Sequence, residues 1–238
     1  SSALGFRNKA ANEHASAVGY GNNAGGVASS AFGFSNVAKV DYASAFGYSN
    51  EASGLASSAV GFRNKAASEN ASAVGYGNNA NALAASAVGY NNTAGGVGSS
   101  TIGYNNTATN ENASAFGYGN TAGGLASSAF GFSNTASGDN ANAFGYNNIA
   151  SGSKSNVFGT GNTVSGSSST AVGTANEVAA ENSTAIGNNN TISSGAENSA
   201  ALGNNISISL KDSVALGNNS TATAINSVTG NSSYTKWA

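Results

Sequence analysis

The feature that most constrains the fold of this chain is a glycine that returns at every fourteenth position from Gly5 to Gly187. The next step, to Gly203, is longer by two positions, and the step to Gly217 has the usual length again. The flanking columns keep the same phase. The residue before the glycine is apolar, the second before it is nearly always alanine, and the third after it is asparagine from Asn8 to Asn190. Such self-similarity at a fixed short period indicates a solenoid in which each repeat is one coil.

The length of the repeat decides which kind of solenoid the sequence predicts. Fourteen residues cannot hold two packed helices, which need repeats of about 33 residues or more. Segments such as SAVGY at 16–20 are typical of short strands bounded by Gly, Asn and Ser. We therefore predict an all-β, parallel, two-sided β-roll with two strands and two tight turns per coil. We expect the asparagines in left-handed turn positions, stacked into amide ladders.

Composition excludes several functional classes. Only 8% of the 238 residues are charged and the net charge is −2, so no basic surface for nucleic acid or membranes is expected. The sequence contains no cysteine, which excludes disulfides and thiolate metal sites. No apolar run approaches the roughly 20 residues that span a bilayer. There is no signal peptide, and the start "SSALG" falls within a repeat, so we expect a fragment of a longer protein.

The apolar content of each coil predicts that rolls associate. Each coil offers one Val, Phe, Ile or Leu, one Ala and often an aromatic residue. The free energy gained by burying these few apolar side chains is small compared with the conformational entropy lost by the backbone, which costs about 1 to 2 kcal/mol per residue. Strand alternation places the apolar and aromatic residues on one face and the Ala and Gly on the other. We expect the face of small residues to admit a second backbone, so that rolls pack side by side in an unspecified number.

One stretch carries a resemblance to a known family. The segment DSVALGNNSTA at 212–222 resembles the motif N-S-V-A-I-G-x-x-S-x-A of the head repeats of YadA-like trimeric autotransporter adhesins, and phased copies cover essentially the whole chain. Most coils depart from the motif. Serine replaces its valine at Ser16, Ser30 and Ser44, and an aromatic residue follows the glycine from Phe6 to Tyr146.

The resemblance implies a left-handed parallel β-roll that assembles as a homotrimer. Residues 1–222 would form a head of about 16 repeats, and residues 223–238 would be the last coil, the start of a neck or an artificial end. It implies a non-enzymatic adhesin head on the bacterial cell surface, anchored in the outer membrane by a C-terminal domain outside this chain. Its ligand would be an extracellular matrix protein, a host cell or an abiotic surface. The trimer-packing and scaffold candidates are Val18, Gly19, Phe32, Gly33, Phe46, Gly47, Val74, Gly75, Phe116 and Gly117.

Variation between coils is the guide to ligand contacts. The turn after the second alanine column varies most, and charges gather toward the N-terminal half. The ligand-contact candidates are Arg7, Lys9, Glu13, Lys39, Asp41, Arg63, Lys65 and Glu69. Each of them could instead serve solubility and edge protection. The eleven aromatic residues from Phe6 to Tyr146 would be core if they point inward and an adhesive stripe if they point outward. We favour packing or an interface for them.

Other functions have weaker support. His14 is the one histidine, and the matching position of a second copy of its segment is Asn70, so no catalytic residue is predicted. The glycine pairs lack the aspartates of calcium-binding β-roll repeats, and neither a metal nor another cofactor is predicted. An ice-binding face needs two ranks of threonine, and only one exists, at Thr93, Thr107, Thr121 and Thr135. A mechanical spacer that carries no ligand of its own remains a second structural alternative.

Overall fold

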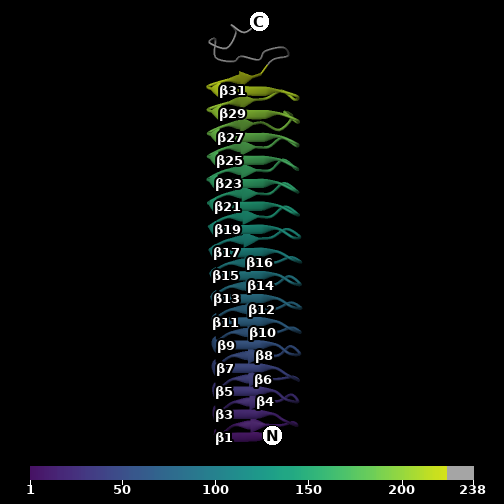
Figure 1. The fold of residues 1–238 in the computed structure, drawn as a ribbon, viewed down its shortest axis with the longest axis vertical. Helices are drawn as coiled ribbons and strands as arrows, with labels where there is room; N and C mark the ends of the chain where they lie inside the picture. The colour runs from purple at the N-terminus through teal and green to yellow at the C-terminus, as the bar shows by residue number, and fades with distance from the viewer. Residues whose placement is uncertain (224–238) are drawn as a thin grey trace. The chain divides into compact units, whose positions relative to one another are not determined.

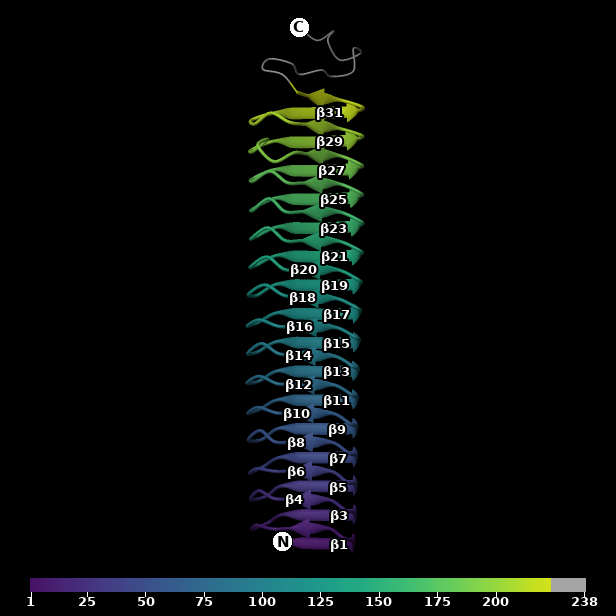
Figure 2. The ribbon, with the colours of Figure 1, turned by 180° about the vertical axis from the view of Figure 1, so that it is seen from behind.

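The computed structural model describes residues 1–223, so the predicted neck or end at 223–238 lies outside the described residues except for its first position. The chain divides into two compact units, Ser1–Gly119 and a second that begins at Asn120. Both consist of coils that carry one long and one short strand (Figures 1 and 2). No helix occurs among the described residues.

The first unit contains nine long and eight short strands. The long strands are β1 (Ser2–Phe6), β3 (Ser16–Tyr20), β5 (Ser30–Phe34), β7 (Ser44–Tyr48), β9 (Ser58–Phe62), β11 (Ser72–Tyr76), β13 (Ser86–Tyr90), β15 (Ser100–Tyr104) and β17 (Ser114–Tyr118). The short strands are β2 (Lys9–Ala10), β4 (Asn23–Ala24), β6 (Val37–Ala38), β8 (Glu51–Ala52), β10 (Lys65–Ala66), β12 (Asn79–Ala80), β14 (Thr93–Ala94) and β16 (Thr107–Ala108).

The second unit contains seven long and eight short strands among the described residues. The long strands are β19 (Ser128–Phe132), β21 (Asn142–Tyr146), β23 (Asn156–Thr160), β25 (Thr170–Thr174), β27 (Thr184–Asn188), β29 (Ala200–Asn204) and β31 (Val214–Asn218). The short strands are β18 (Thr121–Ala122), β20 (Thr135–Ala136), β22 (Ile149–Ala150), β24 (Thr163–Val164), β26 (Glu177–Val178), β28 (Thr191–Ile192), β30 (Ser207–Ile208) and β32 (Thr221–Ala222).

Within each unit, strands of one kind pair in parallel with the same strand of the next coil. The register places like residues over like: Ala17 pairs with Ala31, and Gly19 with Gly33. The period is fourteen positions in every coil but one, so the coils repeat this alignment, and the long strands and the short strands form two separate parallel sheets. The predicted all-β parallel solenoid is confirmed, with about sixteen coils of about fourteen positions each.

The one longer coil keeps this register. Between β28 and β29 the connection holds the two additional residues, with Gly195 at φ +92° and Ala196 fully buried. The strands on both sides stay aligned, since Gly187 pairs with Gly203 and Ile192 with Ile208. The insertion is therefore confined to one turn.

The core is narrow and consists largely of alanine, with one column from each strand and a third column of alanine or serine just before the long strand, as at Ala15 and Ser29. Ala17 and Ala24, one from each strand of their coil, are fully buried, and so are their counterparts in the other internal coils of the first unit. Larger residues take these places in part of the second unit, as at Val164 and Ile192. This corrects one expectation. The alanine face does not receive a second roll, because it is enclosed within the chain, and the larger apolar residues point outward instead.

The asparagine column forms a buried ladder. Asn22 donates from Nδ2 to Oδ1 of Asn8 at 3.0 Å, and its own Oδ1 accepts from Nδ2 of Asn36 at 3.0 Å. Its Nδ2 also lies 2.9 Å from the Val18 carbonyl oxygen and 2.7 Å from that of Gly33. The predicted amide ladder is thus confirmed, whereas the predicted left-handed conformation is wrong for this column. The preceding residue adopts it in every coil, as at Ser35 with φ +54°.

Candidate interaction surfaces

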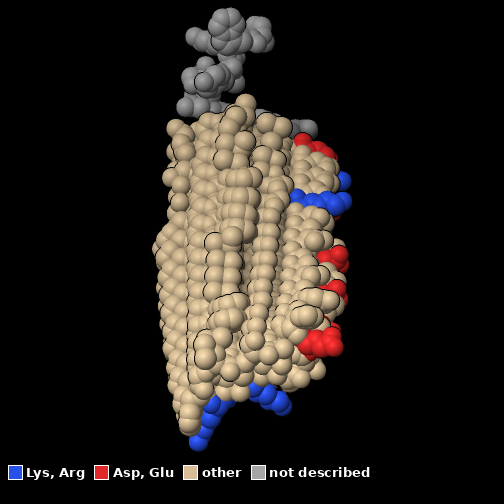
Figure 3. All heavy atoms as spheres, turned by 60° about the horizontal axis from the view of Figure 1, so that its bottom comes forward, with Lys and Arg blue, Asp and Glu red and all other residues tan. Residues whose placement is uncertain are grey.

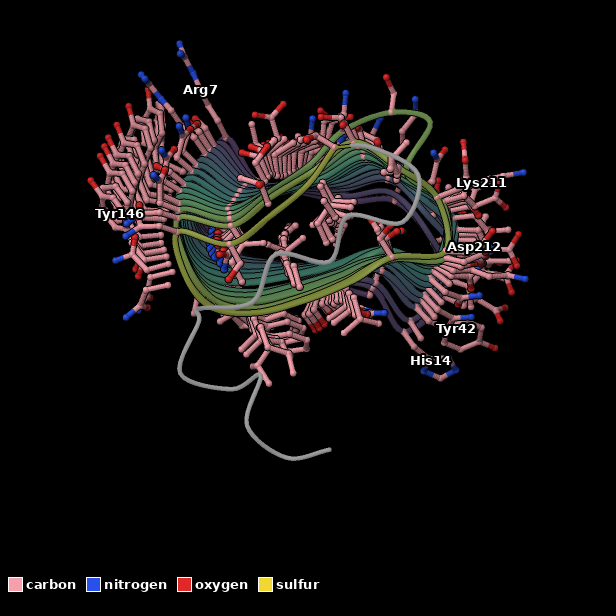
Figure 4. The ribbon with its side chains drawn as sticks, turned by 90° about the horizontal axis from the view of Figure 1, so that it is seen from above. Arg7, His14, Tyr42, Tyr146, Lys211 and Asp212 are labelled. Atoms are coloured by element: carbon pink, nitrogen blue, oxygen red, sulfur yellow. The ribbon has the colours of Figure 1, made fainter. Side chains whose placement is uncertain are left out.

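The outer surface of each coil has two broad faces and two edges. The long-strand face and the short-strand face are the outer sides of the two sheets. In the first unit Arg7 lies at one edge, and His14 and Tyr42 lie at the opposite edge (Figure 4). In the second unit Tyr146 lies at one edge, and Lys211 and Asp212 lie at the other (Figure 4). We call the edge after the long strand the aromatic edge and the opposite one the turn edge.

The long-strand face carries an apolar column. The residue before each glycine points outward from its strand and stays partly exposed: Phe46, Val60 and Val74 are each 37% exposed. Where phenylalanines occupy successive coils, as at Phe32 and Phe46, their rings stack with centroids 5.1 Å apart. The apolar trimer-packing candidates Val18, Phe32, Phe46, Val74 and Phe116 all belong to this column.

The glycines of the same candidate set serve the scaffold. Gly75 has φ +121°, and a Cβ built on it would lie 2.1 Å from the carbonyl oxygen of Gly89 in the next coil. Gly19, Gly33, Gly47 and Gly117 occupy the equivalent position with φ between +116° and +118°. A side chain at this position would therefore collide with the adjacent backbone as well as strain its own.

The aromatic edge of the first unit is a stack of rings. Phe6, Tyr20, Phe34, Tyr48 and Phe62 follow one another with centroids 4.8 to 5.4 Å apart, and the stack continues through Tyr76, Tyr90, Tyr104 and Tyr118. These side chains are not core, since Tyr48 is 39% exposed. Each ring face is covered by a neighbouring ring, so the surface presents ring edges and, at the tyrosines, hydroxyl groups.

Cations flank these rings. The guanidinium carbon of Arg7 lies 5.3 Å from the Phe6 ring centroid, and that of Arg63 lies 5.1 Å from the Phe62 centroid. Both distances allow a cation–π contact. Lys9 and Lys65 follow two residues later, at the start of β2 and β10. The cationic ligand-contact candidates other than Lys39 therefore lie at or next to the aromatic edge.

Acidic residues gather on the turn edge, where Figure 3 shows them along one side. Glu13, Asp41 and Glu69 hold one position of the turn in alternate coils, and Lys39 lies two residues before Asp41. The carboxylate of Asp41 accepts a hydrogen bond from the Val27 backbone N–H of the preceding coil at 2.8 Å. The structure thus separates the eight charged candidates between two opposite edges and does not bring them into one site.

Exposed aliphatic residues share the turn position with the acids. Leu55, Leu83 and Val97 are 44%, 45% and 46% exposed, and Val27 holds the same position. These aliphatic residues were not predicted from the sequence as surface contacts, because only the charged residues of this variable turn were selected. The signal was present as an alternation of acidic and aliphatic residues with a period of two coils, from Glu13 to Glu69.

The residues considered for catalysis, metal binding or ice binding are not brought together into a site in the part of the chain that the structure describes. No group of three His, Asp or Glu side chains there could hold a metal ion. His14 lies exposed in a left-handed turn position with φ 57°. Thr93 and Thr107 stand in a single column at the start of β14 and β16. None of the described segments is a helix of the length and apolarity needed to cross a membrane.

Comparison with protein families gives repeated matches along the chain. The family described as "YadA head domain repeat (2 copies)" matches residues 1–22, 24–50, 52–78, 94–120, 122–148, 165–190 and 211–228. The matches therefore cover well over half of the sequence. A search among curated proteins finds no match.

Proposed function

This chain belongs to the YadA head domain family of trimeric autotransporter adhesins, and we propose that it is a non-enzymatic binding head of a homotrimeric bacterial surface fibre. In this proposal the fibre is anchored in the outer membrane. The head attaches the cell to a matrix protein, to a host cell or to an abiotic surface. The observation that carries the proposal is the half-exposed apolar column on the long-strand face.

That column distinguishes the two broad faces of the roll. The long-strand face presents one Val, Phe, Ile or Leu in every coil. The short-strand face presents mainly Asn, Thr, Lys and Glu at the corresponding outward position, as at Asn79 and Thr93. Of the two, only the long-strand face offers continuous apolar surface, which supports an arrangement with this face toward the three-fold axis.

Each coil would contribute a small favourable free energy to association of the three chains, and these contributions add up along the head. Fully burying a Val, Leu, Ile or Phe side chain is worth about 1.5 to 3 kcal/mol, so burying the exposed two-fifths contributes about 0.6 to 1.2 kcal/mol per coil. Association costs about 4 to 15 kcal/mol in lost translational and rotational freedom. A head with many coils exceeds that cost, whereas a short one would not.

Sedimentation equilibrium at micromolar concentration tests the assembly. We expect three times the chain mass of 23.0 kDa. A folded monomer would contradict the proposed packing.

Attachment is tested separately with beads that carry the trimer. We expect them to be retained on plates coated with a matrix protein, on cultured cells or on plastic, where beads coated with serum albumin are not. The alternative of a mechanical spacer predicts a trimer whose beads bind none of these. Within each unit every coil has the same backbone pairing with the next coil. Such regular parallel sheets are compatible with a binding head and with a spacer.

A further inference from the structure

Two opposite edges of the first unit expose apolar columns that the fold of one chain does not cover. On the aromatic edge, Tyr76 and Tyr90 are 42% and 43% exposed, although their rings stack on one another. On the turn edge, Leu55 and Leu83 are 44% and 45% exposed. Solvation alone would favour polar residues at such positions, so an external contact accounts better for both columns.

Charges at the two edges are paired by coil. In the coil of β1 and β2, Arg7 lies at the aromatic edge, Lys9 lies next to it at the start of the short strand, and Glu13 lies at the turn edge. The arrangement recurs four coils later, where Arg63 and Lys65 accompany Glu69. The two edges therefore have opposite charge in the same coils, as well as apolar columns of similar exposure.

A cyclic trimer brings these two edges together. In a ring of three copies each interface is heterologous, so it joins two different surfaces of neighbouring chains. If the long-strand faces surround the axis, the aromatic edge of one copy meets the turn edge of the next at each corner of the ring. Rotation about the axis does not shift the chain along it, so each coil meets the same coil of its neighbour.

The heights of the charged groups agree with this register. Successive coils are about 4.8 Å apart, so residues four positions apart along one coil differ in height by about 1.4 Å. Lys9 and Glu13 are separated by four positions, as are Lys65 and Glu69. In this register a lysine of one copy would therefore lie within about 1.4 Å of the height of the glutamate of the adjacent copy.

We propose that the turn edge of the first unit binds the aromatic edge of a second copy of this chain, coil for coil. Aliphatic residues of one copy pack against ring edges of the next, and the cations at Arg7, Lys9, Arg63 and Lys65 pair with Glu13 and Glu69. This contact rests on the proposed trimer and specifies its corner. It assigns six of the eight charged candidates to contacts between copies and leaves Lys39 and Asp41 for external ligands.

Disulfide trapping tests the corner, because the native sequence has no cysteine. Ser49 occupies the aromatic-edge position that Arg7 holds in its own coil, and Leu55 occupies the turn-edge position of the same coil. The variant that combines Ser49→Cys with Leu55→Cys cannot close a bond within one chain, since its two thiols lie at opposite edges. On oxidation we expect conversion to covalent trimers on a non-reducing gel, with covalent dimers as intermediates.

The matched control combines Ser49→Cys with Leu83→Cys. Leu83 is two coils beyond Leu55, about 10 Å along the axis, and a disulfide needs Cα atoms within about 7 Å. We expect this pair, and each single cysteine, to give no covalent trimer. Equal trapping of both pairs would overturn the coil-for-coil register.

Sedimentation of the reduced variants separates this inference from the proposed trimer. A trimeric mass without trapping of the Ser49 and Leu55 pair overturns the corner contact and leaves the trimer standing. A monomeric mass, with the β-sheet signal in circular dichroism retained, overturns the trimer itself. Trapping of the same-coil pair alone supports both.

Discussion

At the scale of single residues, the columns differ in how much replacement they allow. Each glycine of the repeated column is subject to two constraints. Its φ is positive, and a carbonyl oxygen of the next coil occupies the place that a Cβ would need, as at Gly75. Two residues later the chain is again left-handed, yet Arg, Ser, Asn, Ala and Gly all occur there, since no backbone blocks the side chain. Close approach therefore makes the first position invariant, and positive φ alone does not.

Gly75→Ala should test that distinction. We expect a loss of at least about 3 kcal/mol in the free energy of unfolding, because strain and the clash with Gly89 act together. Thermal and denaturant unfolding followed by circular dichroism measure it. Gly77→Ala is the matched control. Its φ is +63° and its nearest contact would be an ordinary 3.6 Å, so we expect a cost of about 1 kcal/mol. Equal losses would refute the role of the close approach.

The asparagine ladder should respond to removal of one amide. In Asn78→Ala, the Asn92 backbone N–H loses its acceptor, and Asn92 Nδ2 keeps only the carbonyl oxygens of Val88 and Gly103. The carbonyl oxygens of Val74 and Gly89 each lose a side-chain donor. A buried group left unpaired costs about 1 to 3 kcal/mol, and each of the other lost hydrogen bonds costs about 0.5 to 1.5 kcal/mol, so we expect a loss of at least about 3 kcal/mol. Chemical denaturation gives the value. The control Thr121→Ser, at an exposed outward position of the short-strand face, should change stability by less than about 0.5 kcal/mol, and a similar loss in both variants would contradict the ladder's importance.

At the scale of elements, the coil is the unit that sets register. Every strand pairs with the strand of its own kind one coil away, and alternate side chains point in and out, so a shift by one residue exchanges core and surface. The longer coil before β29 keeps the register because its additional residues stay in one turn. Changes in length are therefore tolerated in whole coils or within turns, and not within strands.

Deletion of residues 72–85 removes one whole coil and joins Ala71 to Ser86. We expect this variant to fold and to show cooperative unfolding, because each column continues across the junction. Deletion of 74–86 removes one residue fewer and joins Ala73 to Ala87 within the long strand. It should destabilise the fold strongly, since Ala87 would take the outward place and Val88 the inward one. Circular dichroism and protease resistance compare the two deletions. Equal resistance would contradict the role of register.

At the scale of the whole molecule, the thin interior of each unit is the physical reason for the proposed assembly. The core of each unit consists largely of alanine, whose burial yields less than that of larger side chains. The larger apolar residues lie outside, on the long-strand face and at both edges. In the proposed trimer another chain would bury them, so we expect the stability of the head to depend on its oligomeric state.

Val74→Asp should test this dependence. The side chain points outward and is 37% exposed, so the substitution leaves the inner core of the chain intact. In a trimer it places three carboxylates around the axis in an apolar setting, which is strongly unfavourable. We expect sedimentation equilibrium to give the mass of a monomer, or of a much weaker trimer. The control Thr121→Asp, at an exposed position of the short-strand face, should leave the trimer intact, and an unchanged mass for Val74→Asp would place the interface elsewhere.

The sequence by itself determined the period, the parallel stacking of like residues and the amide ladder. A constant spacing of fourteen positions leaves no other register in which Gly, Ala and Asn columns all continue. Alternation along SAVGY also showed which residues share a face, but it does not say which face is enclosed. Only the tertiary structure decided that, because a short coil closes tightly and its interior admits alanine and not phenylalanine. The closed coil likewise placed the two turns at opposite edges, which separated charges that the sequence alone had grouped together.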